Sequence, residues 1–274
     1  MAPKFFNSIN KVYVINLKRD HHRRNRVEEQ LNNMKISYQL IDAVSHEDKD
    51  VKEMYRNNKV KTFPPCFRCL KEKCNHENNY LAPRQIANFL SFKKIMEIIC
   101  EEKINNTLIF EDDFNFKFFS KKSFKHLDQY LKDELILDQK EPVLIRIGSH
   151  TTVNKKYYLK FFLLNRTTFM KNTINMANPC FYINLEFAEL FLKDFDTIET
   201  TSDNFIHRKL IRKYKIKNYS MYPFPIMQLS YGRKNNFFKS SINPDQNSIL
   251  NFENKNKVFT KKEYDLLLSE WLSS

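Results

Sequence analysis

Glycine is the residue that this chain most lacks. Only Gly148 and Gly232 occur among its 274 residues, whereas an average protein of this length would contain about 19 at the usual ~7%. A glycine-rich dinucleotide turn and a glycine-rich phosphate loop both need several glycines close together, so neither motif is present. Collagen-like and flexible-linker sequences are excluded for the same reason.

Long apolar runs are also missing. No stretch approaches the roughly 20 apolar residues that span a bilayer, and residues 1–7 lack the features of a signal peptide. We therefore expect a cytoplasmic protein. With 42% hydrophobic and 14% aromatic residues, the chain can build a large core, unlike a disordered segment. Its length is simplest to interpret as a single domain over residues 1–274.

Basic residues are in excess, with 46 Lys+Arg against 32 Asp+Glu and a formal net charge of +14. Such a charge attracts anionic partners. The abundance of Lys, Asn, Ile and Phe is also typical of an AT-rich genome, which would suppress glycine codons as well. The charge alone therefore does not establish an anionic partner.

Apolar patterning predicts alternating strands and helices. The expected strands span residues 11–17, 37–41, 107–110, 143–148 and 181–183, and the expected helices span about 23–34, the segment after Pro83, 186–193 and 261–272. Strand, helix and strand in that order indicate an α/β fold with parallel pairing. Residues 45–80 are polar and cysteine-rich and are expected to leave the sheet as an insertion, and residues 233–274 form a C-terminal extension.

Three consecutive carboxylates, Glu111, Asp112 and Asp113, follow the apolar strand at 107–110. Ligands of open α/β sheets bind outside the carboxyl ends of the strands. Crowded carboxylates there are best accommodated by Mg²⁺ or Mn²⁺, with phosphate oxygens completing the shell. Alternation along an extended segment points Glu111 and Asp113 to one side and Asp112 to the other. The alternative interpretation is a solvated strand end or a helix cap.

A basic segment, residues 18–24, follows the first strand. Basic side chains and helix N-terminal amides together can hold a diphosphate without any glycine. A solvated charged face is the alternative. An RNA-binding patch is disfavoured, because the aromatic side chains that stack on bases are missing from this segment.

Four blocks in this order resemble glycosyltransferase family 25, which includes lipopolysaccharide-biosynthesis glycosyltransferases and procollagen galactosyltransferases. They are Val12–Arg19 with Arg23 and Arg24, then Glu28, Gln30, Leu31 and Ile41–Val44, then Leu81–Phe92, and then Leu108–Asp113. Weaker downstream blocks are Pro179–Ile183, Asp203 and Pro225–Ser230, so that the resemblance covers about residues 11–232.

The resemblance implies a GT-A type, Rossmann-like fold that binds a nucleotide sugar. It also implies a metal-dependent hexosyltransferase that moves galactose or glucose from a UDP-sugar to a hydroxyl of a glycan, glycolipid or protein acceptor. Glu111 and Asp113 would then bind Mn²⁺ or Mg²⁺, and Asp112 would act on the donor ribose or sugar. The residues implied along the donor are Asn16, Leu17, Arg19, Arg23, Arg24, Asp42, Ser91 and Gln228.

Asp203 is our candidate for the base that takes the proton of the acceptor hydroxyl. A helix N-cap before Asn204 is the competing interpretation of this residue. The chain also departs from the family pattern. Phe92 stands where the family usually has histidine, and Arg84 stands near a usual glycine. These departures leave specificity open and permit a catalytically inactive member that acts as a scaffold.

Cys66, Cys69, Cys74 and His76 lie within eleven residues, a spacing compact enough for four-coordinate Zn²⁺. A cytoplasmic chain argues against disulfides, so the alternative is unligated thiols. A closed zinc site would fasten the 45–80 insertion. A zinc-containing nucleic-acid-binding protein is the corresponding alternative function, although nucleic acid is not the partner we expect. Cys100 and Cys180 lie on apolar elements and are expected in the core.

The C-terminal segment carries Trp271 with Leu266, Leu267 and Leu268. This pattern predicts that the last helix packs onto the body of the protein. A basic amphipathic tail that docks peripherally on a membrane is the alternative, and it would suit a lipid-linked acceptor.

Overall fold

The computed structural model describes residues 5–62, 81–133, 140–149, 155–173, 178–229 and 261–273. Its strands are β1 (Lys11–Asn16), β2 (Gln39–Asp42), β3 (Thr107–Glu111), β4 (Phe114–Phe116), β5 (Val143–Arg146), β6 (Gly148–Ser149), β7 (Thr168–Lys171), β8 (Cys180–Ile183), β9 (Lys217–Tyr222) and β10 (Ile226–Gln228). Its helices are α1 (His21–Met34), α2 (Lys49–Arg56), α3 (Pro83–Glu101), α4 (Ser120–Asp133), α5 (Lys155–Leu164), α6 (Leu185–Lys193), α7 (Ser202–Asn204), the π-helix η1 (Phe205–Leu210), α8 (Ile211–Tyr214) and α9 (Lys261–Ser273).

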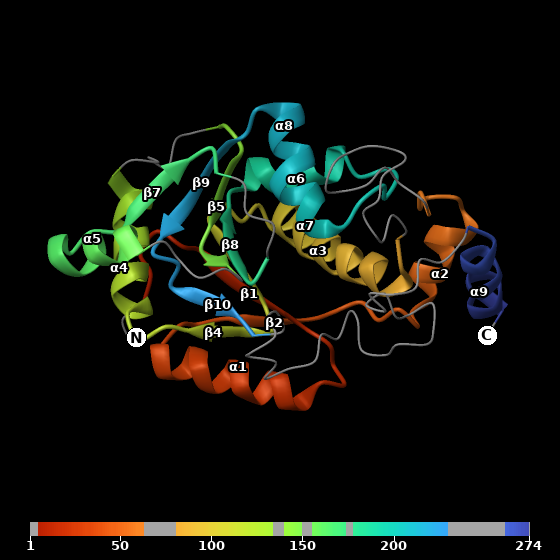
Figure 1. Ribbon diagram of the computed structural model, residues 1–274, viewed down its shortest axis with the longest axis horizontal. Coiled ribbons are helices and arrows are strands. Elements are labelled where there is room, and N and C mark those ends of the chain that lie inside the picture. The colour runs from red at the N-terminus through yellow and green to blue at the C-terminus, as the bar shows by residue number, and fades with distance from the viewer. Residues whose placement is uncertain are drawn as a thin grey trace.

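A seven-stranded sheet with the order β2-β1-β3-β8-β5-β9-β7 forms the centre of the molecule (Figure 1). β1 pairs in parallel with β2 and β3, as the sequence pattern predicts. β8 runs antiparallel to both β3 and β5, and β7 runs antiparallel to β9. The expectation of parallel pairing is therefore confirmed for the first three strands, and the rest of the sheet is mixed, because β5 and β9 also pair in parallel.

Helices cover both faces of this sheet, because its strands alternate apolar side chains toward two separate cores. One core contains Tyr13 and Ile15 of β1 together with residues of α3 and α6. The other contains Val12 and Val14 of the same strand together with residues of α1 and α4. The fold is thus a three-layer mixed α/β arrangement.

The connection from β1 to α1 is fixed by Asp20, whose carboxylate caps the helix by accepting from the Arg23 amide at 3.2 Å. This helix starts at His21 rather than at about residue 23. It ends at Met34, and the left-handed backbone of the following residue, Lys35 (φ 58°), lets the Lys35 and Ile36 amides satisfy the last carbonyls. The cap therefore orients Arg23 toward the sheet, and Arg23 is buried.

A second, three-stranded sheet with the order β4-β10-β6 lies beside the end of β3. Gly148 of β6 pairs with Ile226 of β10. A Cβ at position 148 would lie 2.6 Å from Pro179 Cγ and 3.1 Å from both Cys180 N and Ile226 Cγ2. Glycine is needed here for close packing, since real Cβ atoms do not approach a carbon within 3.0 Å.

The last helix, α9, packs onto the body as expected. Trp271 and Leu268 lie against the first core, and the Trp271 ring meets the Tyr55 ring edge-on at 5.8 Å. Leu266, in contrast, is exposed. Cys180 is buried and Cys100 packs partly buried against the core, which confirms both predictions. No helix in the described part of the chain is long and apolar enough to cross a membrane.

The predicted zinc ligands Cys66, Cys69, Cys74 and His76 lie outside the described residues. The zinc site therefore stays a prediction, as do the GT-A designation and the domain limits.

Candidate active site

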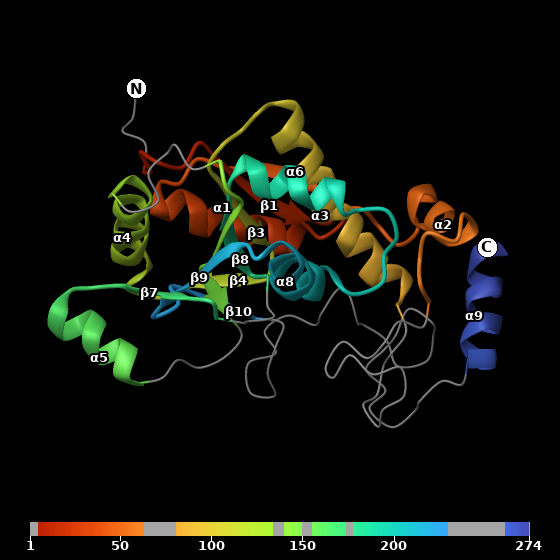
Figure 2. The same ribbon diagram turned by 90° about the horizontal axis from the view of Figure 1, so that it is seen from above.

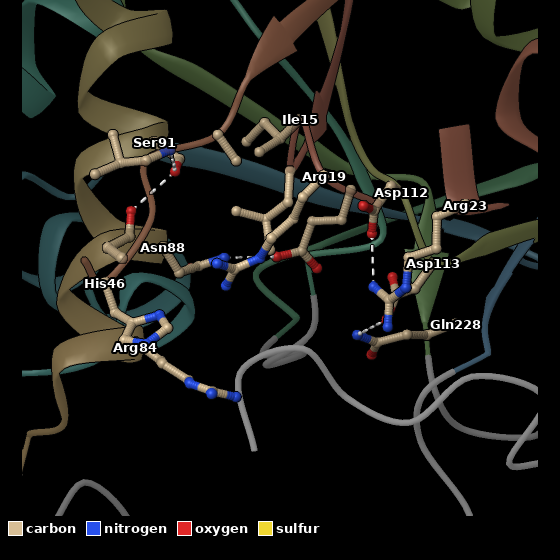
Figure 3. Close-up of a pocket in the computed structure, with 15 residues that line it drawn as sticks. Ile15, Arg19, Arg23, His46, Arg84, Asn88, Ser91, Asp112, Asp113 and Gln228 are labelled. Atoms are coloured by element: carbon tan, nitrogen blue, oxygen red, sulfur yellow. Dashed lines mark hydrogen bonds and ion pairs between the residues drawn. The ribbon is translucent and has the colours of Figure 1, made fainter. Parts of the chain in front are cut away.

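A pocket opens at the carboxyl ends of β1 and β3, where residues from α3 and β10 complete its wall (Figure 3). Because β1 and β3 are parallel with Ile15 beside Glu111, the segment after β1 lies next to the acidic triplet. Eight predicted site residues line this pocket: Leu17, Arg19, Arg23, Ser91, Glu111, Asp112, Asp113 and Gln228. The structure thus brings together most of the site that the family resemblance implies.

Asp112 is held by a cation and an amide. Arg23 Nη1 donates to its Oδ1 at 2.7 Å, and Asn16 Nδ2 donates to its Oδ2 at 2.8 Å. Arg23 is itself fixed by Asp20, whose Oδ2 lies 3.1 Å from Arg23 Nε. Burial raises the pKa of Asp112 to about 6, against the opposing effect of Arg23. Both carboxylate oxygens of Asp112 therefore already accept hydrogen bonds, and one of the two donors is Arg23.

Glu111 and Asp113 each accept a hydrogen bond from a neutral amide. Asn88 Nδ2 of α3 donates to Glu111 Oε1 at 3.3 Å, and Gln228 Nε2 of β10 donates to Asp113 Oδ2 at 3.1 Å. The backbone supports the second contact, because the Leu229 amide donates to the Asp113 carbonyl at 2.7 Å. Burial and the nearby charge of Asp113 raise the pKa of Glu111 well above its ordinary value. These two carboxylates therefore form an electrostatically strained pair.

The strained pair fits a divalent cation that arrives with a phosphate-bearing ligand. Among the described residues, no group of three or more His, Cys, Asp and Glu side chains could hold a metal ion. Mg²⁺, however, is commonly bound by one or two carboxylates together with substrate phosphates. Glu111 and Asp113 supply two such carboxylates, and a cation bound there would offset the burial and the repulsion that raise the pKa of Glu111.

Two arginines besides Arg23 line the pocket. Arg84 lies on α3, and Arg19 follows β1 and pairs with Glu47 at 2.8 Å on the surface. Figure 3 shows Arg84 and His46 beside α3, away from Asp112 and Asp113. His46 is buried, and burial together with the Arg84 charge lowers its pKa below the ordinary value. The pocket therefore contains cationic arginines and a neutral imidazole as well as the carboxylates.

Four of the predicted donor residues have other roles or positions. Asn16 is buried and supports Asp112 rather than lining the pocket. Arg24 pairs with Glu28 on the outside of α1 at 3.1 Å. Asp42 does not line the pocket. Ser91 does, but its hydroxyl donates to the Ala87 carbonyl and accepts from the Val44 amide, each at 2.9 Å, so that it joins α3 to the segment after β2.

Asp203 lies close enough to Glu111 to raise the pKa of that carboxyl. It stands in the first turn of α7, where Thr201 is the N-cap residue, so the competing interpretation of Asp203 as the cap itself is wrong. Ser202 Oγ donates to Asn88 Oδ1, which joins α7 to the amide that holds Glu111. Burial raises the pKa of Asp203, while a hydrogen bond from Thr201 opposes that rise.

A buried arginine fastens this region to the sheet. Arg146 of β5 is fully buried and donates through Nε to His207 Nδ1 at 3.1 Å and through Nη2 to the His207 carbonyl at 3.2 Å. Nη1 donates to Asn218 of β9 at 3.1 Å. Burial and the Arg146 charge lower the pKa of His207 far below its ordinary value, so its ring is neutral and Nδ1 can accept. This network positions η1, which continues directly from α7 and Asp203.

Sequence reasoning missed Asn88 and His46 as pocket residues and treated Arg84 only as a departure from the family pattern. Helical spacing could have found two of them, because Arg84, Asn88 and Ser91 follow one another at intervals of four and three residues on one face of α3. His46 carries no such signal, since it lies in an irregular segment between β2 and α2.

Most residues that line this pocket lie in a segment that matches a known protein family. The model of the family described as "Glycosyltransferase family 25 (LPS biosynthesis protein)" matches residues 9–206. No curated protein matches the chain. Among solved structures, the chain is similar to a "glycosyltransferase involved in the glycosylation of the major capsid of PBCV-1", with 9% sequence identity, 75% of this chain and 76% of the other covered, and a TM-score of 0.33.

Proposed function

Because the chain belongs to glycosyltransferase family 25, we propose that its pocket binds a UDP-hexose with Mn²⁺ or Mg²⁺ and transfers the sugar to an acceptor hydroxyl. Galactose or glucose is the proposed sugar, and a glycan, glycolipid or protein is the proposed acceptor. The observation that carries the proposal is that one pocket contains both a carboxylate pair, Glu111 and Asp113, and two arginines, Arg19 and Arg84.

The carboxylate pair is the proposed cation site. Glu111 and Asp113 are bonded by the neutral amides of Asn88 and Gln228, which orient the carboxylates without neutralising them. A bound cation would neutralise the charge that develops on the departing diphosphate. Arg19 and Arg84 would contact phosphate oxygens of the donor, as arginines commonly do. Leu17 and Val44, which line the same pocket, would contact the nucleoside.

Asp112 is proposed to orient the donor rather than to bind the cation. Its two oxygens are fixed by Arg23 and Asn16, so its position is set before any ligand binds. Preorganised groups of this kind stabilise charge in the transition state without rearrangement. The Arg23 and Asp112 pair therefore supplies a rigid edge against which a sugar can be placed.

Asp203 is the proposed base for the acceptor hydroxyl. Its raised pKa makes it a stronger base than an ordinary aspartate. It belongs to the hydrogen-bonded segment that runs through Ser202 and Asn88 to Glu111, so base and cation site are held by one set of contacts. The Arg146 and His207 network keeps this segment in place.

The test uses the full-length chain with UDP-galactose or UDP-glucose and Mn²⁺, and measures UDP release. We expect release that requires the cation and that Asp113→Ala abolishes. Asp133→Ala is the matched control, since Asp133 is exposed at the end of α4. Full activity in Asp113→Ala would remove the cation assignment. No release and no thermal shift with either donor and Mn²⁺ would contradict the proposal and favour an inactive scaffold.

A further inference from the structure

Exposed apolar side chains gather at one end of the molecule. Six large apolar side chains of the described residues are exposed, and five of them belong to α5 or to Phe118. The five are Phe118, Leu159, Phe162, Leu163 and Leu164, with exposed fractions between 49% and 87%. Figures 1 and 2 both show α5 projecting from the body at the end opposite to α9. An apolar group of this kind commonly marks an interaction site.

The inner side of α5 is firmly packed. Phe161 is fully buried, with its ring centroid 5.1 Å from that of Phe119. The Tyr157 ring lies 4.8 Å from the Tyr222 ring, and Lys117 Nζ donates to the Tyr158 hydroxyl at 3.0 Å. The exposed side chains therefore belong to an ordered helix that presents a second apolar face to solvent.

That outer face has helical spacing. Leu159, Phe162 and Leu163 follow at i, i+3 and i+4 and so lie side by side on the helix. The Phe118 ring stacks on the Phe162 ring at a centroid distance of 5.7 Å and an angle of 11°. The apolar surface is therefore continuous from α5 to the turn before α4. We call these four residues with Leu164 the α5 patch.

The two chain segments that contribute the α5 patch carry charged side chains of one sign only. Residues 114–127 contain four lysines, residues 155–173 contain four lysines and one arginine, and neither segment contains Asp or Glu. An anionic bilayer attracts each such residue near its surface by about 1 kcal/mol. Protein–protein interfaces, in contrast, are depleted in lysine. The combination favours an anionic lipid surface over a protein partner.

We propose that the α5 patch docks the protein on an anionic lipid bilayer, with α5 lying in the headgroup region. Leu159, Phe162 and Leu163 enter the acyl boundary while Lys160 and Arg166 remain among the headgroups. At ten residues, α5 is about 15 Å long, about half the bilayer core, so it lies in the interface and does not span it.

The C-terminal helix is the other segment whose sequence suggested a membrane contact, and its apolar face is already used. Tyr264 is fully buried and donates its hydroxyl to the Leu81 carbonyl. Trp271 packs against Tyr55. Leu266 is exposed alone among charged neighbours. The structure therefore moves the proposed membrane contact from α9 to α5.

The experiment is co-sedimentation of the full-length chain with phosphatidylcholine vesicles, with and without phosphatidylglycerol. We expect binding that needs the anionic lipid. Leu159→Gln/Leu163→Gln should weaken it at least about tenfold, because two apolar side chains no longer leave water. Lys160→Gln/Arg166→Gln should weaken it by about the same factor and flatten its salt dependence. The matched controls Leu266→Gln and Lys261→Gln/Lys262→Gln change the same residue types on α9 and should bind like the natural protein.

Three results would overturn the proposal. Vesicle binding that Leu159→Gln/Leu163→Gln leaves unchanged would show that the apolar face does not enter the bilayer. An equal loss in the α9 controls would show that only total charge or hydrophobicity matters. A dimer of the natural protein that this double variant converts to monomer would assign the patch to self-association. All readouts are independent of catalysis, so failure of the proposed function leaves this proposal testable.

Discussion

Asp112 and its neighbours Glu111 and Asp113 are adjacent in the chain, yet they meet groups of different charge. Asp112 faces the guanidinium of Arg23, which is itself held by Asp20. Glu111 and Asp113 face the amides of Asn88 and Gln228. Asp112 is thus paired directly with a guanidinium at 2.7 Å, while Glu111 and Asp113 accept from amides, and Arg23 and Arg26 act on Asp113 through their nearby charge.

The difference shows how a run of like charges acquires separate roles. A carboxylate paired with a buried arginine contributes to the folded structure. Removing either partner is expected to lower the free energy of unfolding strongly. Carboxylates held by neutral donors keep their charge available for a ligand, at the expense of repulsion in the free protein. The following predictions test this division between a neutralised side, Asp112, and an available side, Glu111 and Asp113.

The largest effect is expected on the available side. Asp113→Asn keeps the shape of the side chain and removes its charge, so UDP release with Mn²⁺ should fall about 1,000-fold, with no loss of melting temperature. Initial rates and thermal unfolding measure the two quantities. Asp133→Asn should leave both as they are. A rate within a few-fold of the natural protein would mean that Asp113 does not contact the cation.

On the neutralised side, the main effect is expected on stability. Arg23→Leu leaves Asp112 buried without its cation, so the free energy of unfolding should fall by about 3 kcal/mol. Urea denaturation measures it. Arg24→Leu is the control, because Arg24 is part of a half-exposed pair with Glu28, and pairs of that kind contribute less than about 1 kcal/mol. An equal loss of unfolding free energy in the two variants would contradict the assignment of Arg23 as the cation that stabilises Asp112.

A smaller effect should follow from removing an amide donor. Gln228→Met keeps the length of the side chain but cannot donate to Asp113, so the Mn²⁺ concentration for half-maximal activity should rise about tenfold. A metal titration of UDP release gives this value. Gln129→Met changes the same residue type on the surface of α4 and should have no effect. An unchanged titration for Gln228→Met would show that this amide does not orient Asp113.

The smallest effect concerns the metal-free protein. Because burial and Asp113 raise the pKa of Glu111 well above 4.5, the folded state keeps this proton to higher pH than the unfolded chain does. Stability in EDTA should therefore fall as pH rises above about 4.5. Glu111→Gln should remove this fall and be more stable than the natural protein at pH 7, while losing activity. Denaturation curves at pH 5 and 7 that are parallel for both proteins would contradict this.

Much of the first half of the fold could be predicted from sequence. Strands β1 and β3 and helix α3 have clear apolar periodicity, and Pro83 marks the start of α3 as expected. The mixed direction of the sheet could not be predicted. β8 is a short, fully buried apolar strand, and its sequence does not indicate its direction in the sheet. Its antiparallel placement depends on long-range pairing with β3 and β5.

The candidate site shows the same limit. The acidic triplet is one continuous stretch of sequence, and so is the segment after β1. Each could therefore be identified from the sequence alone. Which carboxylate Arg23 would neutralise could not, because that depends on the turn geometry set by the Asp20 cap. Asn88 and Gln228 lie 23 and 115 residues from their carboxylate partners, and only the folded chain brings them there.

Gly148 has a consequence that reaches the active site. Its missing side chain lets Pro179 and Ile226 approach closely. The Pro179 carbonyl accepts from the Glu111 amide, and Ile226 is two positions before Gln228 on the same strand. In evolutionary terms, we expect purifying selection to keep glycine at position 148 even where base composition disfavours glycine codons. Sequences that diverge widely in base composition should keep glycine at this position for as long as they keep the carboxylate pair.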